Sequence, residues 1–298
     1  MISGQVPNHL VANARAGFLS SIKADVPAWQ RIAAMHDMDG KTSDLVDLGA
    51  IPMPVESKTG TTVQDYIERH IQVEPTDWDI TVFISHNALS DDRTGTLDQR
   101  VRGAAVNFNR HFNKLAYSAL NAGDGSTYGL AYDGGNFYQN THIDSGAAYQ
   151  TAQDNLYALT LSMDNFETVR VAASTVRDDQ GEYSGYNHNL LIVPPAYERI
   201  AANITSNPED MATANRKMNP YANVVSYLVS PYLDSTAWVL VGADEVHKPL
   251  IFAMREQPNL QSAWFDPKAP DGGRYYFKFF ARYNVFYGDW RLAFLGNT

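Results

Sequence analysis

The chain has no cysteine among its 298 residues. This absence excludes disulfide bonds, cysteine-ligated zinc, iron–sulfur clusters and thiol catalysis together. No apolar run approaches the roughly 18 residues that span a bilayer, so we expect no membrane-spanning segment and no membrane partner. The first ten residues lack the basic start and the apolar stretch of a secretory signal. These absences fit a reducing cytoplasm, although missing cysteine alone assigns no compartment.

The signatures of common enzyme classes are missing as well. The sequence contains no Gly-x-Ser-x-Gly elbow, no Walker loop, no dinucleotide fingerprint and no His-x-x-x-His pair. Residues 36–40 resemble part of a calcium loop, but the ligand spacing does not continue and no closing glutamate follows. Two acidic pairs, Asp91-Asp92 and Asp178-Asp179, lie at expected helix ends, where capping and solvation account for them. We therefore expect no metal, no cofactor and no catalytic residue.

Charge and composition narrow the class of protein further. The chain carries 33 acidic and 23 basic residues, for a net charge of −10. That balance argues against a protein whose whole surface binds nucleic acid, and it leaves room for a local basic face. A hydrophobic content of 44% with 12% aromatic residues is typical of a globular chain. Its length suffices for one large domain or two smaller ones.

Hydrophobic periodicity predicts both helices and strands. Apolar residues recur every three or four positions in 8–24, 96–122 and 151–176, and Pro194-Pro195 leads into a further helix through Ile204. Alternation with a period of two predicts strands over 67–73 and 78–84, joined into a hairpin by a turn at 74–77. Further strands are expected at 190–193, 224–229, 238–241, 249–254 and 274–295. The predicted fold class is α+β.

For two segments the sequence pattern predicts too few apolar contacts to form a hydrophobic core of their own. The stretch from the first helix to Gly49 has no sustained period, which indicates an extended arm. The predicted hairpin has only two strands, and an isolated two-stranded ribbon is marginally stable in water. We therefore expect the arm and the hairpin to be stabilised by packing on something else.

The helix over 96–122 is basic in an acidic protein. Five basic residues and one acidic residue lie between Arg93 and Ala122. Arg100, Arg110 and Lys114 fall within a sector of about 80° that points away from the apolar stripe. This face is either a contact for a nucleic-acid backbone or a solvated, acid-paired surface.

A series of short segments, taken in order, carries a family resemblance over nearly the whole chain. These segments are Trp78–Val82 leading to Leu89–Asp92, Tyr132–Tyr138 ending at His142, Leu191–Pro195 with Glu198 and Ala201, Ser230–Leu233 with Trp238, Pro249–Phe252 with Arg255, and Ala281-Arg282 with Tyr287–Trp290. In order and spacing they resemble the major head (capsid) protein family of Mu-like tailed bacteriophages. Each segment is weak alone, and the resemblance lies in the series.

The resemblance implies the tailed-phage major capsid fold of the Hong Kong phage type, which herpesvirus capsid floors and encapsulin shells share. Its parts would be an N-terminal arm at 1–50, an extended hairpin called the E-loop at 51–92, a peripheral domain at 93–144 and 263–298 with a spine helix at 93–122, and an axial domain at 145–262. An arm, a hairpin and a long helix are also expected in that order from the periodicity alone.

The resemblance implies a structural protein rather than an enzyme. Its copies would self-assemble into hexamers and pentamers of an icosahedral head around double-stranded DNA, held by non-specific contact. It would be a virion component assembled in the bacterial host cytoplasm, with a separate scaffolding protein, a protease, a portal and a decoration protein as further partners. An encapsulin-like shell around protein cargo is the alternative. A soluble hydrolase that uses Asp133 and His142 is a rival, and it requires a deep pocket that gathers both residues.

The assembly contacts expected on this view are charged residues of the hairpin and the long helix. They are Lys58, Asp65, Glu68, Arg69, Glu74, Arg100, Arg110 and Lys114. The basic face of the long helix would face either packaged DNA or the acidic hairpin of an adjoining copy. Some capsids of this fold crosslink a hairpin lysine to a peripheral-domain asparagine, and Lys58 with Asn284 is one pair that could serve. An ordinary solvated lysine is the alternative for Lys58.

Overall fold

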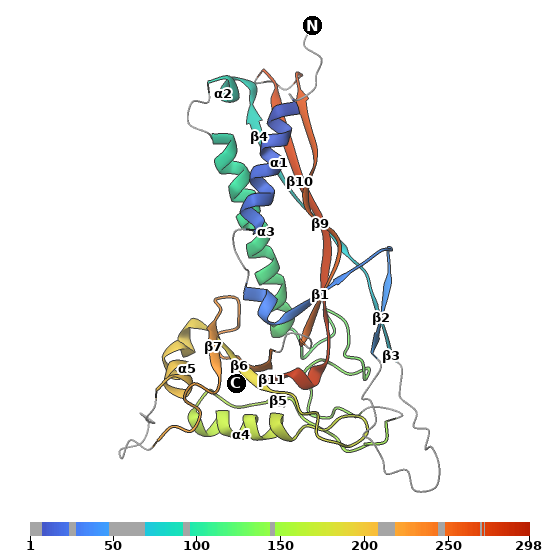
Figure 1. Cartoon of the computed structure of the whole chain (residues 1–298), viewed down its shortest axis with the longest axis vertical. Coiled ribbons are helices and arrows are strands. Elements are labelled where there is room, and N and C mark those ends of the chain that lie inside the picture. The colour runs from blue at the N-terminus through green and yellow to red at the C-terminus, as the bar shows by residue number, and fades with distance from the viewer. Residues whose placement is uncertain are drawn as a thin grey trace.

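In a computed structural model of the chain, the described residues are 8–23, 28–47, 69–91, 96–143, 147–207, 218–243, 248–268, 270 and 272–298. They form an elongated part, built from long strands and two helices, and a smaller part built around a second sheet (Figure 1). None of the described helices combines the length and the apolar character needed to cross a bilayer.

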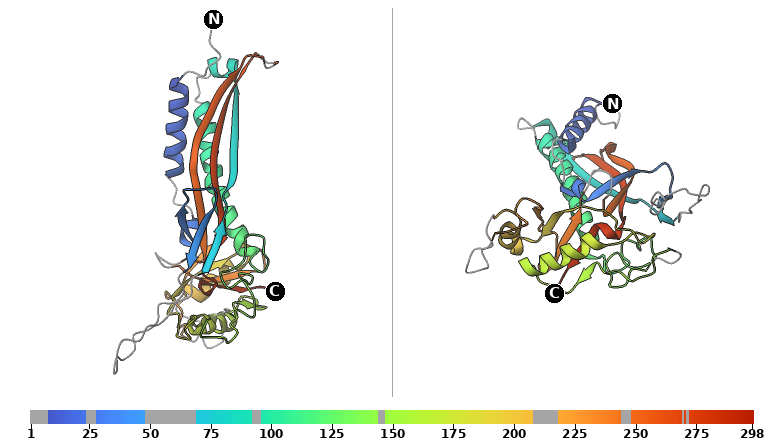
Figure 2. Two further views of the ribbon diagram at one scale, coloured as in Figure 1. Left: turned by 90° about the vertical axis from the view of Figure 1, so that its right-hand side faces the viewer. Right: turned by 60° about the horizontal axis from the view of Figure 1, so that its bottom comes forward.

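The elongated part is a four-stranded sheet covered by helices on one face. The strands, in sheet order, are β1 (Ala33–Asp37), β9 (Leu250–Asp266), β10 (Arg274–Tyr287) and β4 (Thr76–Ser85). In β10 every second side chain is buried, which is the pattern of a strand with one face on a core. The helices α1 (Asn8–Lys23) and α3 (Thr96–Asn121) lie together on that face (Figures 1 and 2). Both helices were predicted from their apolar spacing, and both are confirmed.

The N-terminal segment packs on its own chain. Phe18 of α1 stacks on Phe279 of β10 with 4.4 Å between the ring centroids. Trp29, in the short helix η1 (Ala28–Arg31), packs between Phe112 and Phe252 at 5.6 and 4.6 Å. Burying an aromatic side chain contributes about 1.5–3 kcal/mol. The stretch after the first helix was expected to pack on something else, and over residues 28–37 it packs on the rest of its own chain.

Both strands of the predicted hairpin form, but each pairs with a strand other than the predicted one. Strands β3 (Arg69–Val73) and β4 lie close to the predicted positions, but β4 pairs antiparallel with β10. β3 instead pairs antiparallel with β2 (Ser43–Asp47), which makes a two-stranded ribbon. The reason is burial: Trp78, Ile80 and Val82 pack against the main core, which a lone hairpin could not provide. The predicted pairing of 67–73 with 78–84 is thus wrong, and residues 48–68, between β2 and β3, lie outside the described part of the chain.

The smaller part is a five-stranded sheet. Its strands, in sheet order, are β5 (Leu156–Tyr157), β11 (Ala293–Gly296), β8 (Trp238–Gly242), β6 (His188–Val193) and β7 (Ser226–Val229). The helices α4 (Met163–Thr175) and α5 (Glu198–Thr205) flank it (Figure 1). The remaining short helices are α2 (His86–Ser90), η2 (Pro195–Tyr197) and η3 (Trp290–Leu292).

The helix predicted over 151–176 begins late. Residues 156–157 form β5, and α4 begins only after Ser162, whose hydroxyl accepts a hydrogen bond from the Asn165 amide at 3.2 Å. A serine in this position satisfies an amide that has no partner within the helix, so it fixes the helix start. The prediction is confirmed for 163–175 and wrong for the residues before.

Two predicted boundaries also shift. β9 starts at Leu250, so residues 250–262 belong to the four-stranded sheet and not to the smaller part. β11 joins the five-stranded sheet, so the C-terminal strands do not all return to the elongated part. The chain crosses between the sheets at Gly288, whose N donates to Pro249 O at 2.8 Å. A Cβ on Gly288 would lie 2.9 Å from the Lys248 carbonyl oxygen, so this approach favours glycine.

Candidate functional site

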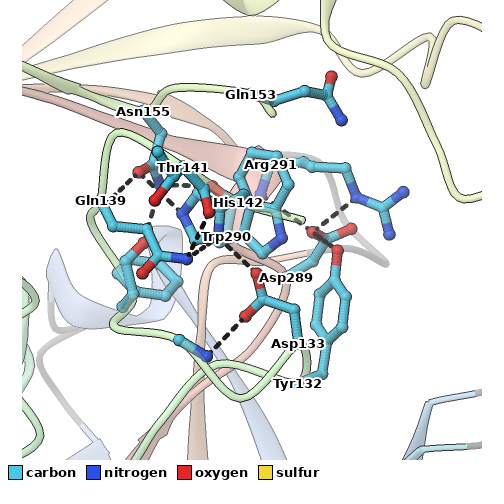
Figure 3. Close-up of polar contacts among 12 residues, drawn as sticks. Tyr132, Asp133, Gln139, Thr141, His142, Gln153, Asn155, Asp289, Trp290 and Arg291 are labelled. Atoms are coloured by element: carbon cyan, nitrogen blue, oxygen red, sulfur yellow. Dashed lines mark hydrogen bonds and ion pairs between the residues drawn. The ribbon is translucent and has the colours of Figure 1, made fainter. Parts of the chain in front are cut away.

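A buried polar cluster links the 128–149 loop to the C-terminal strands (Figure 3). His142 Nδ1 lies 2.6 Å from Asp133 Oδ2, and its Nε2 lies 3.1 Å from Asn155 Oδ1. The imidazole stacks on the Trp290 ring at a centroid distance of 3.8 Å and an interplanar angle of 1°. Asn155 Nδ2 donates to the carbonyl oxygens of Phe137, Trp290 and Ala293. Asn155 Oδ1 is therefore the acceptor that His142 meets.

The cluster gathers the two residues of the hydrolase hypothesis without giving them a cleft. The side chains of His142 and Asp133 are 0% and 1% exposed, and both ring nitrogens already have partners. The adjoining pocket holds about 20 Å³, which is room for a single water molecule. A general base must reach a proton on a bound substrate, and no substrate fits here. The geometry therefore gives this pair a structural role: it stabilises the fold through buried hydrogen bonds.

An ionic network adjoins the cluster. Asp289 Oδ1 lies 3.0 Å from Arg291 Nε, and Tyr186 donates to Asp289 Oδ2 at 2.9 Å. Burial alone would raise the pKa of Asp289, but the charge and hydrogen bonds of Arg291, with the Tyr186 hydroxyl, outweigh burial and hold that pKa below its usual value. Asp289 in turn raises the pKa of Arg291. Asp289 is thus ionised at neutral pH and fixes the turn between β10 and η3.

Arg69 belongs to the same region. Its guanidinium is buried 3.6 Å from Asp179 Oδ2 and lies 4.8 Å from the centre of the Tyr132 ring. Arg291 approaches the same ring at 5.4 Å. Arg69 was expected as a surface contact with another copy, and this is wrong because the side chain is buried within its own chain. Since Arg69 is the first residue of β3 and pairs with Asp47, the ion pair ties the end of the β2–β3 ribbon next to residues 48–68 to the smaller part.

The basic face of α3 is exposed, as its spacing predicts. Arg100, Arg110 and Lys114 all face solvent. Arg100 Nη1 donates to the Phe83 carbonyl oxygen at 2.6 Å, whereas Arg110 and Lys114 form no ion pair within the described residues. Next to them, His111 Nδ1 contacts the Tyr283 hydroxyl at 2.6 Å. Burial, and then the charge of Lys114, lower the pKa of His111.

The other expected contact residues fall in two groups. Lys58, Asp65 and Glu68 lie outside the described residues, so their contacts stay predictions. Glu74 is exposed between β3 and β4, and its carbonyl oxygen accepts from Asn284 Nδ2 at 3.4 Å. Asn284 lies on β10, half-buried.

Several residues of the cluster escape the sequence analysis. Asn155, Trp290 and Arg291 bear no recognisable motif, although Asp289-Trp290 belongs to a segment of the family resemblance. Asp179 was assigned to capping or solvation, and instead it is buried beside Arg69. Of the Asp178-Asp179 pair, Asp178 has the expected capping role, since its Oδ1 accepts hydrogen bonds from the amides of Gln180 and Glu182.

Comparison with known proteins supports a capsid function. The family model for phage capsid protein matches residues 71–291, which is most of the chain. No curated protein matches the sequence.

Three solved particles share the fold. The procapsid subunit of bacteriophage JBD30 is 17% identical with a TM-score of 0.56, covering 98% of this chain and 76% of that chain. The capsid of an empty GTA particle is 13% identical with a TM-score of 0.57, covering 91% and 89%. The virus-like particle from Pyrococcus furiosus is 10% identical with a TM-score of 0.54, covering 96% and 98%.

At these identities the likeness establishes the fold, and the family model establishes the family. The family is structural, in agreement with the closed Asp133–His142 cluster. The chain therefore belongs to the phage capsid protein family and is a structural major capsid protein with the tailed-phage fold of the Hong Kong phage type.

Proposed function

We propose that copies of this chain assemble into hexamers and pentamers of an icosahedral head around double-stranded DNA. Assembly would take place in the bacterial cytoplasm with a separate scaffolding protein, a protease and a portal, and a decoration protein would bind the finished head. The narrower resemblance to the Mu-like group stays a prediction. A nanocompartment around protein cargo has less support, because the family model that matches describes phage capsid proteins.

Within this proposal, the domains follow the two sheets. The peripheral domain corresponds to the four-stranded sheet with α1 and α3, and α3 is the spine helix. The axial domain corresponds to the five-stranded sheet with α4 and α5. The E-loop corresponds to the ribbon of β2 and β3 together with residues 48–68.

The ribbon is the observation that carries the proposal. β2 and β3 pair only with each other among the described strands. Their base packs on a small cluster of Met38, Val73 and Ala253, separate from the main core. Arg69 anchors the other end of the ribbon to its own chain, so burial on an adjoining copy would stabilise residues 48–68 beyond it. Head-to-tail contacts of this kind close into rings.

A second contact is proposed for the basic face of α3. Arg110 and Lys114 are exposed, and lysine and arginine bind phosphates without reading sequence. We propose that this face meets packaged DNA. The net charge of −10 keeps such contact weak, as release of DNA from a container requires.

The assembly proposal is tested by shortening the hairpin. Residues 49–67 are replaced by a four-residue Gly-Ser linker, which keeps β2, β3 and the edge strand β4. We expect a folded subunit, with unchanged circular dichroism and thermal unfolding, that sediments as monomers or small oligomers. The full-length chain under the same conditions should sediment as shells. Closed shells of normal size from the shortened chain would refute the assignment of the hairpin.

A further inference from the structure

A polar pocket lies where the elongated part meets the smaller part (Figure 1). Its volume is about 440 Å³, and small-molecule sites occupy about 300–1,000 Å³. Arg31, at the end of η1, and Lys248, just before β9, line it from the elongated part. Asn189 of β6 and Ser226 of β7 line it from the smaller part. A molecule bound here would therefore touch both parts.

The two cations of this pocket have neutral partners. Arg31 Nη2 donates to Ser226 Oγ at 3.0 Å, and Lys248 Nζ donates to the Gln30 carbonyl oxygen. Neither side chain forms an ion pair with a described residue. The described residues that line the pocket include no acid, in a chain whose 33 acidic residues outnumber its 23 basic ones. The pocket is thus locally positive in a negative protein.

Side-chain amides add neutral donors to the two charges. Asn189 Oδ1 accepts from the Ala243 amide at 3.2 Å, so its Nδ2 is the group left to donate to a ligand. Asn223 also lines the pocket, and its backbone is held by a 2.7 Å hydrogen bond from its amide to the Thr205 carbonyl oxygen. Its side-chain amide forms no hydrogen bond with the described residues, so it too can donate. Cations beside amide donors form a surface suited to oxygen-rich anions.

The donor set favours phosphate groups among such anions. A guanidinium fork pairs with two phosphate oxygens at once, and a lysine ammonium adds a compact second charge. A chain of phosphate groups offers enough oxygens to meet both cations and the amides together. No aromatic ring is among the described lining residues, so a nucleobase would find no stacking surface. The pocket therefore recognises the charged groups of a ligand rather than a base.

We propose that this pocket binds a ligand with at least two linked phosphate groups. Arg31 and Lys248 would contact the phosphate oxygens, and Asn189 Nδ2 would donate to them. A free oligophosphate and a nucleic-acid backbone share this chemistry. Because the contacts come from both parts of the subunit, the bound ligand would stabilise their junction. The site lies within a single copy, so it does not depend on the proposed shell.

Calorimetric titration of the full-length chain with sodium tripolyphosphate, at low salt, tests the site. We expect saturable binding that Arg31→Gln/Lys248→Gln weakens at least about tenfold, because two charged contacts are lost. The matched control Arg15→Gln/Lys41→Gln removes the same charge from exposed positions on other elements and should bind as the wild type does. Equal losses in the two double variants would overturn the proposal, since net charge alone would then govern binding.

A single substitution tests the pocket without removing either cation. Asn189→Asp keeps the acceptor for the Ala243 amide and the size of the side chain, but it places a carboxylate beside the phosphates. We expect an unchanged circular dichroism spectrum and a loss of tripolyphosphate binding of at least about tenfold. A folded Asn189→Asp variant that binds as tightly as the wild type would contradict the proposed site.

A second probe distinguishes the two sources of phosphate. A short DNA duplex is titrated in the same way into the wild type and both double variants. Duplex binding that only Arg31→Gln/Lys248→Gln weakens, without tripolyphosphate binding, would assign the pocket to a nucleic-acid backbone, and the reverse would assign it to a free oligophosphate. Failure of both probes to bind in a manner that depends on the pocket would overturn the proposal.

The chain's own acids provide the remaining control. Asp244 and Glu245 lie between Ala243 and Lys248 in the sequence. Tripolyphosphate binding by Asp244→Asn/Glu245→Gln but not by the wild type would show that these carboxylates take the place of a ligand, and the proposal would be wrong. All of these titrations use the dilute, unassembled chain, so their outcome is separate from whether shells form.

Discussion

Asp133, His142 and Asn155 hold together three distant stretches of chain with hydrogen bonds that water cannot reach. Buried polar groups of this kind are stabilising only while each keeps its partner. His142 is sandwiched against Trp290, and Asn155 satisfies the carbonyl oxygens of the crossing from η3 to β11. The residues that a hydrolase hypothesis selects from the sequence thus serve to join the 128–149 loop to Asn155 and the segment from η3 to β11.

Asp133→Asn should destabilise the subunit without changing its fold. The substitution keeps the shape but replaces a charge-assisted hydrogen bond to His142 with a neutral one. We expect the free energy of unfolding to fall by about 2 kcal/mol, measured by urea denaturation of the unassembled chain. Asp124→Asn, at an exposed position, should change it by less than about 0.5 kcal/mol. Equal free energies of unfolding for the two variants would show that the cluster does not stabilise the subunit.

Asp289→Asn should flatten the acid sensitivity of the subunit. The pKa of Asp289 is lowered in the folded state, so its stabilisation is complete above the unfolded value of about 3.9 and is lost as pH falls through the lowered value. Between about pH 5 and pH 2, the wild type should lose melting temperature more steeply than Asp289→Asn. The exposed Asp234→Asn serves as control and should follow the wild type. Parallel curves for all three proteins would contradict the role of the ion pair.

Single residues were predictable where exposure follows from local spacing. The solvent-facing positions of Arg110 and Lys114 follow from helical periodicity alone. The burial of Arg69 does not, because it depends on Asp179 and Tyr132, which are far away in sequence. The alternation over 78–84 does predict that Phe83 faces away from Val82 and Ile84, but its position opposite Tyr276 depends on a strand far away in sequence.

At the scale of elements, the local sequence determines where a strand lies along the chain, whereas its pairing partner depends on distant residues. Alternation predicts β4 to within about two residues, yet pairing with β10 is set by the need to cover one face of the core. For the same reason, the pairing of β2 with β3 was missed. The late start of α4 reflects a single capping serine in an otherwise helical pattern. The sequence thus predicts which segments are helices and which are strands, whereas the order of strands in each sheet depends on how the whole chain packs.

The spine helix offers an element-scale prediction on DNA binding. Arg110→Glu/Lys114→Glu should weaken binding of the full-length chain to a 50-base-pair duplex, because two phosphate contacts become repulsive. The loss should be at least about tenfold near 50 mM salt and shrink as salt rises. Fluorescence anisotropy of the labelled duplex measures it.

The matched control reverses two exposed cations on other elements, Arg15 of α1 and Lys41 before β2. It changes the net charge by the same amount and should retain most of the affinity. Equal losses in both double variants would show that net charge, rather than the α3 face, governs contact with DNA.

At the scale of the whole molecule, the subunit combines a rigid body with a ribbon that extends from it. The elongated sheet, its two helices and the smaller part share one continuous hydrophobic core. The ribbon base belongs to a separate small cluster. A subunit of this kind can fold alone, but it keeps surfaces that become buried only against other copies. A shell protein requires both properties. The fold class and the family were predictable from the sequence, because the order of many weak segments carried them.

Negative-stain electron microscopy of the purified chain, with and without co-expressed phage proteins, tests the central claim most directly. We predict closed icosahedral particles of uniform diameter, because the family and the fold are those of a capsid subunit. Monomers that persist even in the presence of the phage proteins would contradict a shell-forming function.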